Sequence, residues 1–247
     1  MPAMMPPCSA SSTLLGLSAL LLLAVTVCAA QRPGCQDLDG NCRRWVGSEP
    51  LLCVTTPYVT ENCLDSCGKC GPVRPEYDER NAPAYLKSVS FLLGKWRTEH
   101  SGKVTFPTIP VFTYGEEVDF HLSETSRTGL VSVNYTSFAW GINEHLDLHS
   151  EQGYLTADRW RPNRLSLTTT MNNGFVTVEE GTVRGHRLVL RLHDIGRISF
   201  SRDMQVVDVI REFTLLDRHT LEQRIQMETV VHPRQDHTFV RYNKIYP

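Results

Sequence analysis

The residues of this chain that could do chemistry are nine histidines and eight cysteines within 247 residues. A neutral imidazole can ligate a metal or move a proton, and a cysteine can form a disulfide, hold a metal or act as a nucleophile. No contiguous catalytic motif accompanies them, because the sequence has no Gly-x-Ser-x-Gly elbow, no His-Glu-x-x-His helix and no glycine-rich phosphate loop. Any reaction would therefore come from a bound cofactor, with the protein supplying its ligand and its surroundings.

The cysteines divide the chain into two parts. Six lie between Cys35 and Cys70, and the stretch that follows Cys70 contains none. A module this short cannot bury enough apolar surface to fold alone, so three disulfides are expected to hold it. Six cysteines allow fifteen pairings, and spacing does not choose among them. Cys67-x-x-Cys70 alone would suit a redox dithiol, but the four neighbouring cysteines and the lack of a βαβ pattern favour a structural role.

The remaining two cysteines lie in an apolar leader. Leu14–Val27 is an apolar run of the length of a signal-peptide core, and Cys28-Ala29-Ala30 supplies small residues for cleavage. We therefore predict a signal peptide over residues 1–30 and a secreted, extracellular protein. A transmembrane helix needs about 20 apolar residues, so we expect no stable membrane insertion. An uncleaved N-terminal anchor is the alternative, because no Lys or Arg precedes the run.

Residues 31–71 form the cysteine-rich module. Its diagnostic residues are Cys35-x-Asp37, Cys42-x-x-Trp45, Cys53, Pro57-Tyr58 and Cys63-x-x-Ser66-Cys67-x-x-Cys70. On these residues the module resembles the ShKT (sea-anemone-toxin-like) domain, and the resemblance implies the pairs Cys35–Cys70, Cys42–Cys63 and Cys53–Cys67. Channel-blocking members carry a Lys directly before the Tyr, where this chain has Pro57. We therefore expect a spacer or an interaction module with an extracellular protein partner.

The second part of the chain has the pattern of a β-barrel. Residues 72–83 are rich in proline and charge and are expected to be an extended linker. Over residues 84–247, apolar and polar residues alternate in about ten short runs, which include Ile198-Phe200. Turn signals separate them, among them Asn172-Asn173-Gly174, Glu180-Gly181 and Arg184-Gly185. The sequence therefore predicts one or two helical turns at Ala84–Leu92, followed by a mainly β, antiparallel barrel. Such a barrel closes its edges and can hold a ligand.

Motifs along this second domain resemble those of the nitrobindins, the THAP4-like haem-binding domains. They are Gly94-Lys95-Trp96, Phe106-Pro107-Thr108-Ile109-Pro110, Glu151-x-Gly153-Tyr154-Leu155 and His237-x-x-Val240-x-Tyr242-x-Lys244. The resemblance implies a ten-stranded, calycin-type barrel with ferric haem b, which binds nitric oxide and isomerises peroxynitrite to nitrate. It assigns His237 as the axial iron ligand and Thr108 as a haem contact, and no further catalytic residue.

The position of His237 can be examined by alternation alone. In an extended strand, His237 and Phe239 share one face while Thr238, Val240 and Tyr242 share the other. An inward His237 is therefore expected beside Phe239.

Trp96 is expected to plug the core at the start of the barrel.

The chain departs from the family pattern in its first strand. Thr98 and His100 stand where the family has glycines, and Gly102 comes later. Since glycine permits close backbone approach, this strand is expected to lie differently at the haem site. Two alternatives therefore stay open: a secreted carrier of haem, lipid or another small hydrophobic ligand, and a structural module without a cofactor.

Two further features concern partners and modification. A formal net charge of −2 gives no electrostatic footprint for nucleic acid. Asn134-Tyr135-Thr136 is an N-glycosylation sequon in a chain expected to enter the secretory pathway. Alternation places Asn134 on the face opposite Val133 and Tyr135, so we expect Asn134 to face outward and to be modified.

Overall fold

The computed structural model describes residues 35–247 apart from residues 50, 125–129 and 143–145. The predicted signal peptide at residues 1–30 lies outside the described residues.

The cysteine-rich module is a small helical unit held by disulfides. Its helices are α1 (Cys42–Ser48), α2 (Leu52–Thr55) and α3 (Pro57–Asn62). Its disulfides are Cys35–Cys70, Cys42–Cys63 and Cys53–Cys67, the same pairs that the resemblance to ShKT domains implied. The buried centre of the module consists of Cys42, Val59 and Cys63. Because so little apolar surface is buried there, the disulfides supply much of what holds the module together.

The segment 72–83 departs from the extended conformation expected for it. It contains two short 3-10 helices, η1 (Pro75–Tyr77) and η2 (Glu79–Asn81). Tyr77 is 4% exposed, its hydroxyl donates to the Asp119 carboxylate at 2.9 Å, and its ring meets that of Tyr246 edge to face. The charged and proline-rich composition argued against a long helix or strand, but a single aromatic side chain is enough to dock such a segment on a neighbouring strand.

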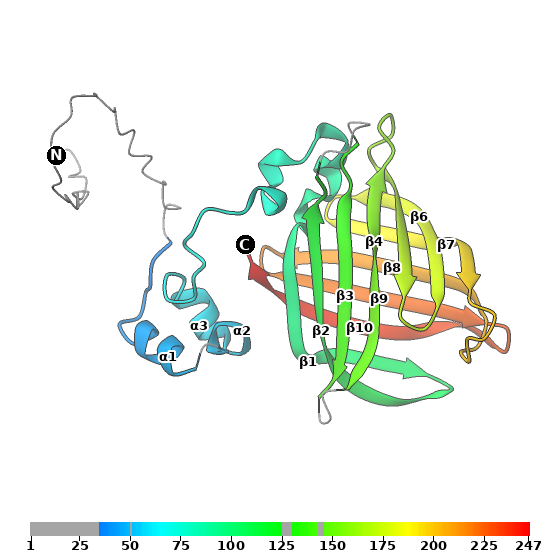
Figure 1. Ribbon diagram of the computed structural model, residues 1–247, viewed down its shortest axis with the longest axis horizontal. Coiled ribbons are helices and arrows are strands. Elements are labelled where there is room, and N and C mark those ends of the chain that lie inside the picture. The colour runs from blue at the N-terminus through cyan, green and yellow to red at the C-terminus, as the bar shows by residue number, and fades with distance from the viewer. Residues whose placement is uncertain (1–34, 50, 125–129, 143–145) are drawn as a thin grey trace, which may run out of the picture. The chain divides into compact units, whose positions relative to one another are not determined.

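Ten antiparallel strands follow η3 (Ala84–Leu92) and form a closed barrel (Figure 1). Each strand pairs with its neighbours in the chain, and β1 pairs with β10. This confirms the predicted mainly β, antiparallel ten-stranded barrel. The strands are β1 (Gly94–Phe106), β2 (Ile109–Leu122), β3 (Val133–Gly141), β4 (Asp147–Ala157), β5 (Arg164–Met171), β6 (Phe175–Arg184), β7 (Arg187–Arg197), β8 (Val206–Asp217), β9 (Thr220–Thr229) and β10 (His232–Tyr246).

Two local expectations within the barrel were wrong. Ile198-Phe200 is not a strand, because β7 ends at Arg197 and a turn begins at Ile198, whose carbonyl accepts a hydrogen bond from Ser201. Gly181 is not in a turn but inside β6, where an added Cβ would lie 1.8 Å from the Val189 carbonyl oxygen. Glycine is required at position 181 because two strands approach closely there.

η3 and the start of β1 fill one end of the barrel. Leu86, Val89 and Leu92 on η3 are fully buried, and so is Trp96 on β1. The Trp96 indole Nε1 donates to the Leu92 carbonyl at 2.7 Å, which satisfies its one polar group within the core. Trp96 thus occupies the position expected of it. In the described part of the chain, no helix has the length and apolarity needed to cross a membrane.

A buried ion cluster lies near the middle of the strands. Arg211 on β8, 2% exposed, donates to both oxygens of Glu151 at 2.6 and 3.0 Å and from Nε to Glu179 at 3.0 Å. The Tyr135 hydroxyl also donates to Glu151, at 2.6 Å. Burial acts to raise the pKa of Glu151, but the charge and hydrogen bonds of Arg211, with smaller contributions from His149 and Tyr135, together outweigh it and the pKa is lowered. For Glu179 burial prevails and the pKa is raised. The cluster therefore depends on Arg211, since buried carboxylates must be paired.

A second buried carboxyl, Glu116 on β2, accepts a hydrogen bond from Ser137 and lies 3.0 Å from the Tyr242 hydroxyl oxygen. That hydroxyl also contacts the Gln223 side-chain oxygen. Because the hydroxyl has one proton, it cannot donate to both oxygens. Burial raises the pKa of Glu116 to about 7, against the opposing hydrogen bonds from Ser137 and Tyr242. With a proton on Glu116, the carboxyl could donate to the Tyr242 hydroxyl oxygen while that hydroxyl donates to Gln223.

Reduction of the disulfides should unfold the cysteine-rich module without unfolding the barrel. We expect residues 35–70 to unfold, at a cost of roughly 2–5 kcal/mol, while the barrel keeps its own thermal transition because residues 84–247 contain no cysteine. Calorimetry with and without reductant measures this. A barrel melting temperature that fell substantially on reduction would contradict it.

Replacing Arg211 should destabilise the barrel strongly. In Arg211→Met the carboxylates of Glu151 and Glu179 stay buried without their cation, which should cost roughly 3–5 kcal/mol of unfolding free energy in denaturant titrations. The matched control is Arg187→Met. It removes an exposed ion pair with Glu212, and should cost no more than about 1 kcal/mol. Similar losses for both variants would show that the buried cluster contributes no more to stability than an exposed ion pair does.

Glu116 should make barrel stability depend on pH. Its pKa is raised in the folded protein, so its contribution is complete below its ordinary value of 4.5 and is lost as pH rises through about 7. We expect the wild type to lose more stability than Glu116→Gln between about pH 5 and about pH 8 in urea titrations, because glutamine does not titrate. Equal losses would show that Glu116 does not hold a proton in the fold.

Candidate haem site

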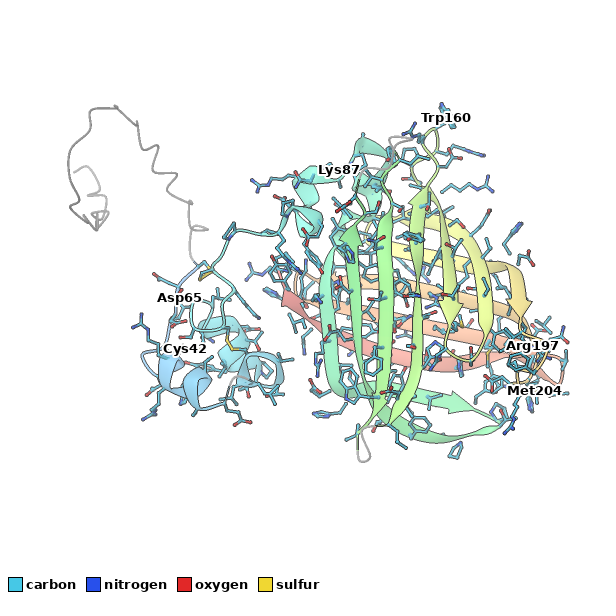
Figure 2. The ribbon with its side chains drawn as sticks, viewed as in Figure 1. Cys42, Asp65, Lys87, Trp160, Arg197 and Met204 are labelled. Atoms are coloured by element: carbon cyan, nitrogen blue, oxygen red, sulfur yellow. A yellow bond between two sulfur atoms is a disulfide. The ribbon has the colours of Figure 1, made fainter. Side chains whose placement is uncertain are left out.

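The candidate site lies at one end of the barrel. Because the strands run up and down in chain order, the connections β1–β2, β3–β4, β5–β6, β7–β8 and β9–β10 lie at the same end, which we call the mouth. Met204, in the β7–β8 connection, lies at the mouth, and Trp160, in the β4–β5 connection, lies at the opposite end (Figure 2).

A β-bulge turns His237 into the barrel. The ladder between β10 and β9 pairs Asp236 with Gln226 and Thr238 with Ile225, so His237 is an extra residue in β10. Its Nδ1 is buried and has no hydrogen-bond partner among the described residues. Its ring meets Phe106 edge to face, with 5.4 Å between ring centroids. The bulge therefore points the His237 side chain inward, whereas regular alternation would have pointed it outward.

The bulge also corrects the expected neighbour of His237. Phe239 lies 4.9 Å from the Arg224 guanidinium carbon and 5.4 Å from that of Arg241, while the following Val240 is fully buried. Phe239 therefore faces outward, and the expectation that it flanks an inward His237 was wrong. The flanking aromatic is Phe106, at the end of β1.

A second imidazole, His149, faces the same end of the barrel. His149 lies two residues before buried Glu151 on β4, so alternation places both on the inner face. Burial lowers the pKa of His237 to about 4, with a smaller contribution from His149. Burial also lowers the pKa of His149, against the charge of Glu151. Both imidazoles are therefore neutral at neutral pH, the form in which a ring nitrogen can donate to a metal.

Thr108, the second expected haem contact, lies in the turn that joins β1 to β2. This turn is at the mouth, two residues after Phe106, and Thr108 is exposed. The fold thus places Thr108 and His237 at the same end of the barrel. A contact between Thr108 and haem stays a prediction.

Apolar side chains are exposed around the mouth. They belong to the ends of strands and to the connections there, and so they come from distant parts of the sequence. Exposed apolar side chains gathered at one end favour an apolar ligand or partner. Among them are Val111, Phe112, Leu146, Leu148, Ile198, Phe200, Met204, Val207, Val230 and Val231.

The first strand accommodates Thr98 and His100 by an irregularity. Pairing of β1 with β2 shifts between Thr98 and Gly102, and the Thr98 hydroxyl bonds to the Ser101 hydroxyl at 2.8 Å. At Gly102 an added Cβ would lie 2.7 Å from the Tyr114 ring. The β1 backbone therefore approaches Tyr114 closely at Gly102, and a difference from the family in this strand stays a prediction.

Sequence reasoning missed His149 and the Arg211 cluster. His149 could have been found by extending the alternation of Leu155 and Ala157 backwards along β4 to Glu151 and His149. Arg211 gave no comparable signal, because its partners are contributed by strands far away in the sequence.

Comparison with known proteins adds to this geometry. Residues 85–244 match the signature of the family described as "THAP4-like, heme-binding beta-barrel domain". The chain is 42% identical over 238 residues to an uncharacterized protein of Caenorhabditis elegans, covering 92% of this chain and 79% of that protein. It is 32% identical over 179 residues to rat "Peroxynitrite isomerase THAP4", covering 72% of this chain but only 30% of that protein. It is 33% identical to "Peroxynitrite isomerase 1" of Mycobacterium tuberculosis, covering 63% of this chain and 92% of that protein.

A solved structure shares the barrel. The crystal structure of Rv2717c from M. tuberculosis superposes with a TM-score of 0.55 at 30% sequence identity, covering 66% of this chain and 98% of that chain. The barrel, its mouth histidine and the match over residues 85–244 agree with one another. With its disulfide-rich, ShKT-like module in front, this chain belongs to the family of THAP4-like, heme-binding β-barrel domains.

Proposed function

We propose that this chain is a secreted haem protein whose barrel holds haem b, reacts with nitric oxide and isomerises peroxynitrite to nitrate. The observation that carries the proposal is the buried, unpartnered Nδ1 of His237, which the bulge turns toward the mouth of a barrel of this family. Relatives named as peroxynitrite isomerases support the reaction. The apolar leader and the three disulfides support secretion.

The residues at the mouth fit a haem group. A buried polar atom without a partner is costly unless a ligand completes it, and the His237 ring has such an atom. The exposed apolar side chains of the mouth would lose their contact with water against a porphyrin. His237 would hold the iron, and Thr108 would contact the group from the β1–β2 turn.

The chain's own contribution is positioning and electrostatics. Phe106 packs edge-on against His237 and limits rotation of its ring. Burial keeps the His237 imidazole neutral, so its lone pair is available down to about pH 4. With one protein ligand, bound ferric haem would offer an open coordination position for nitric oxide or peroxynitrite.

A carrier function is the second candidate. The exposed apolar rim of the mouth would also suit haem carried for transport, a lipid or another small hydrophobic ligand, without catalysis. Absorption in the Soret region of protein purified from a haem-sufficient host separates haem binding from the other ligands. Kinetics of peroxynitrite decay with the purified haem protein then separate catalysis from carriage.

Replacing His237 should remove haem binding and leave the fold. His237→Ala deletes a side chain whose Nδ1 makes no hydrogen bond among the described residues, so far-ultraviolet circular dichroism should be unchanged. Haem affinity, measured by titration in the Soret region, should fall by at least the roughly 10–100-fold that loss of an outer-shell partner costs. Reactivity with nitric oxide and peroxynitrite should be lost with it.

Two histidines serve as controls for this variant. His219→Ala changes an exposed histidine in the β8–β9 turn, at the end opposite the mouth, and should bind haem like the wild type. His232→Ala is the stricter control, because its ring also meets Phe106, at 5.7 Å between centroids, and it too should keep the haem. A native Soret band and native ligand kinetics in His237→Ala would reject the assignment of His237 as the iron ligand and would favour the carrier function.

A further inference from the structure

The sequon at Asn134 lies on the outer surface of the barrel. Along β3, Val133 and Tyr135 are buried, whereas Thr136 is exposed and Asn134 is partly exposed. The two side chains that define the sequon therefore share the outer face, and the residue between them points inward. Asn134-Tyr135-Thr136 is the single sequon in the chain.

Asn134 is held in a row of side chains that crosses three strands. It pairs with His121 on β2 and with Tyr154 on β4. Its Nδ2 lies 2.9 Å from His121 Nε2, and His121 Nδ1 lies 3.1 Å from the Asp119 carboxylate. One tautomer satisfies both contacts, with His121 donating from Nδ1 to Asp119 and accepting at Nε2 from Asn134. The Asn134 amide has two N–H groups, so attachment of a sugar to Nδ2 would still leave one to donate to His121.

A groove runs beside this amide on the outer face of β2 to β6. Its volume is about 500 Å³, and His121, Asn134, Gln152, Tyr154, Thr168 and Val176 are among the residues that line it. Tyr154 is 55% exposed, although it is an aromatic residue in the middle of a strand. The apolar face of a pyranose ring stacks on aromatic rings, and hydroxyl and amide groups such as those of Thr168 and Gln152 can bond its hydroxyls.

We propose that Asn134 carries an N-linked glycan whose first N-acetylglucosamine lies in this groove against the Tyr154 ring. The proposal rests on the secretory route of the proposed function and is independent of haem. The sugar would come from a lipid pyrophosphate-linked oligosaccharide of the secretory pathway. A bond forms between Asn134 Nδ2 and the sugar C1, the bond from C1 to the pyrophosphate oxygen breaks, Nδ2 loses one proton, and the lipid pyrophosphate leaves.

Transfer must precede completion of the barrel. In the fold, the backbone of Asn134 is paired on both sides, with β2 and with β4. An enzyme that needs an extended acceptor can reach the sequon only before those ladders form. The glycan then covers the outer face of β3 and β4 rather than the mouth, so haem binding and glycosylation can occur on the same molecule.

Occupancy is tested with the full chain expressed with its own leader in a secreting eukaryotic cell. We expect the secreted protein to exceed the polypeptide mass by one glycan, and to lose this excess on N-glycosidase treatment, in Asn134→Gln and in Thr136→Ala. Thr136→Ser keeps the sequon and should keep the excess. Secreted wild type at the bare polypeptide mass would overturn the proposal. A chain retained in the cytosol would overturn it together with the secretory route, whereas the Soret assay on the same protein would report on haem separately.

The position of the sugar is tested by a double-mutant cycle. Asn134→Gln is measured in the wild type, in Tyr154→Phe and in Tyr154→Ala, all secreted from the same cells. Loss of the glycan should lower the melting temperature by roughly 2–4 °C where the ring at position 154 is present, and by much less in Tyr154→Ala. Equal shifts in all three backgrounds would show that the sugar does not lie on Tyr154.

Discussion

The pairing of β1 with β10 is the contact on which the rest of the structure depends, because it closes the sheet and gives it an interior. Val104 pairs with Thr238 and Lys103 with Phe239 across this seam. The same seam brings Phe106, at the end of β1, against His237, near the start of β10, although the two residues are far apart in the sequence. Both strands are also irregular there, β1 between Thr98 and Gly102 and β10 at His237. The candidate site is thus built where the barrel closes.

The interior changes character along the barrel, and the electrostatics of its parts are connected. The end under η3 is apolar around Trp96, the middle holds the Arg211 cluster, and the mouth holds the two imidazoles. Burial disfavours a charge on His149, the charge of Glu151 favours it, and the weaker effect of Arg211 disfavours it. Burial and His149 act in the same sense on His237. Burial is therefore the main reason that the mouth imidazoles stay in the neutral form that a metal requires.

Much of the fold could be predicted from the sequence, because alternation and turn residues act locally. The barrel and the helical lead-in at Ala84–Leu92 follow from such patterns, whereas the burial of Trp96 was expected from the family motif Gly94-Lys95-Trp96. The ion cluster could not be predicted, since Glu151, Glu179 and Arg211 are polar residues on three separate strands that only the closed barrel brings together. The inward direction of His237 was also beyond local reasoning. A bulge adds one residue without any signature in the alternating pattern, so the histidine could be named from family motifs but its neighbour could not.

The bulge in β10 makes the direction of His237 depend on the number of residues in the strand as much as on their identity. Removing one residue between Gln235 and Thr238 would restore a regular ladder, and a histidine at the shortened position would then follow the ordinary alternation of the strand. The last strand should therefore accept many substitutions on its outer face but few changes of length. A relative that keeps the histidine and lacks the extra residue would retain the motif in its sequence and lose the ligand from its interior.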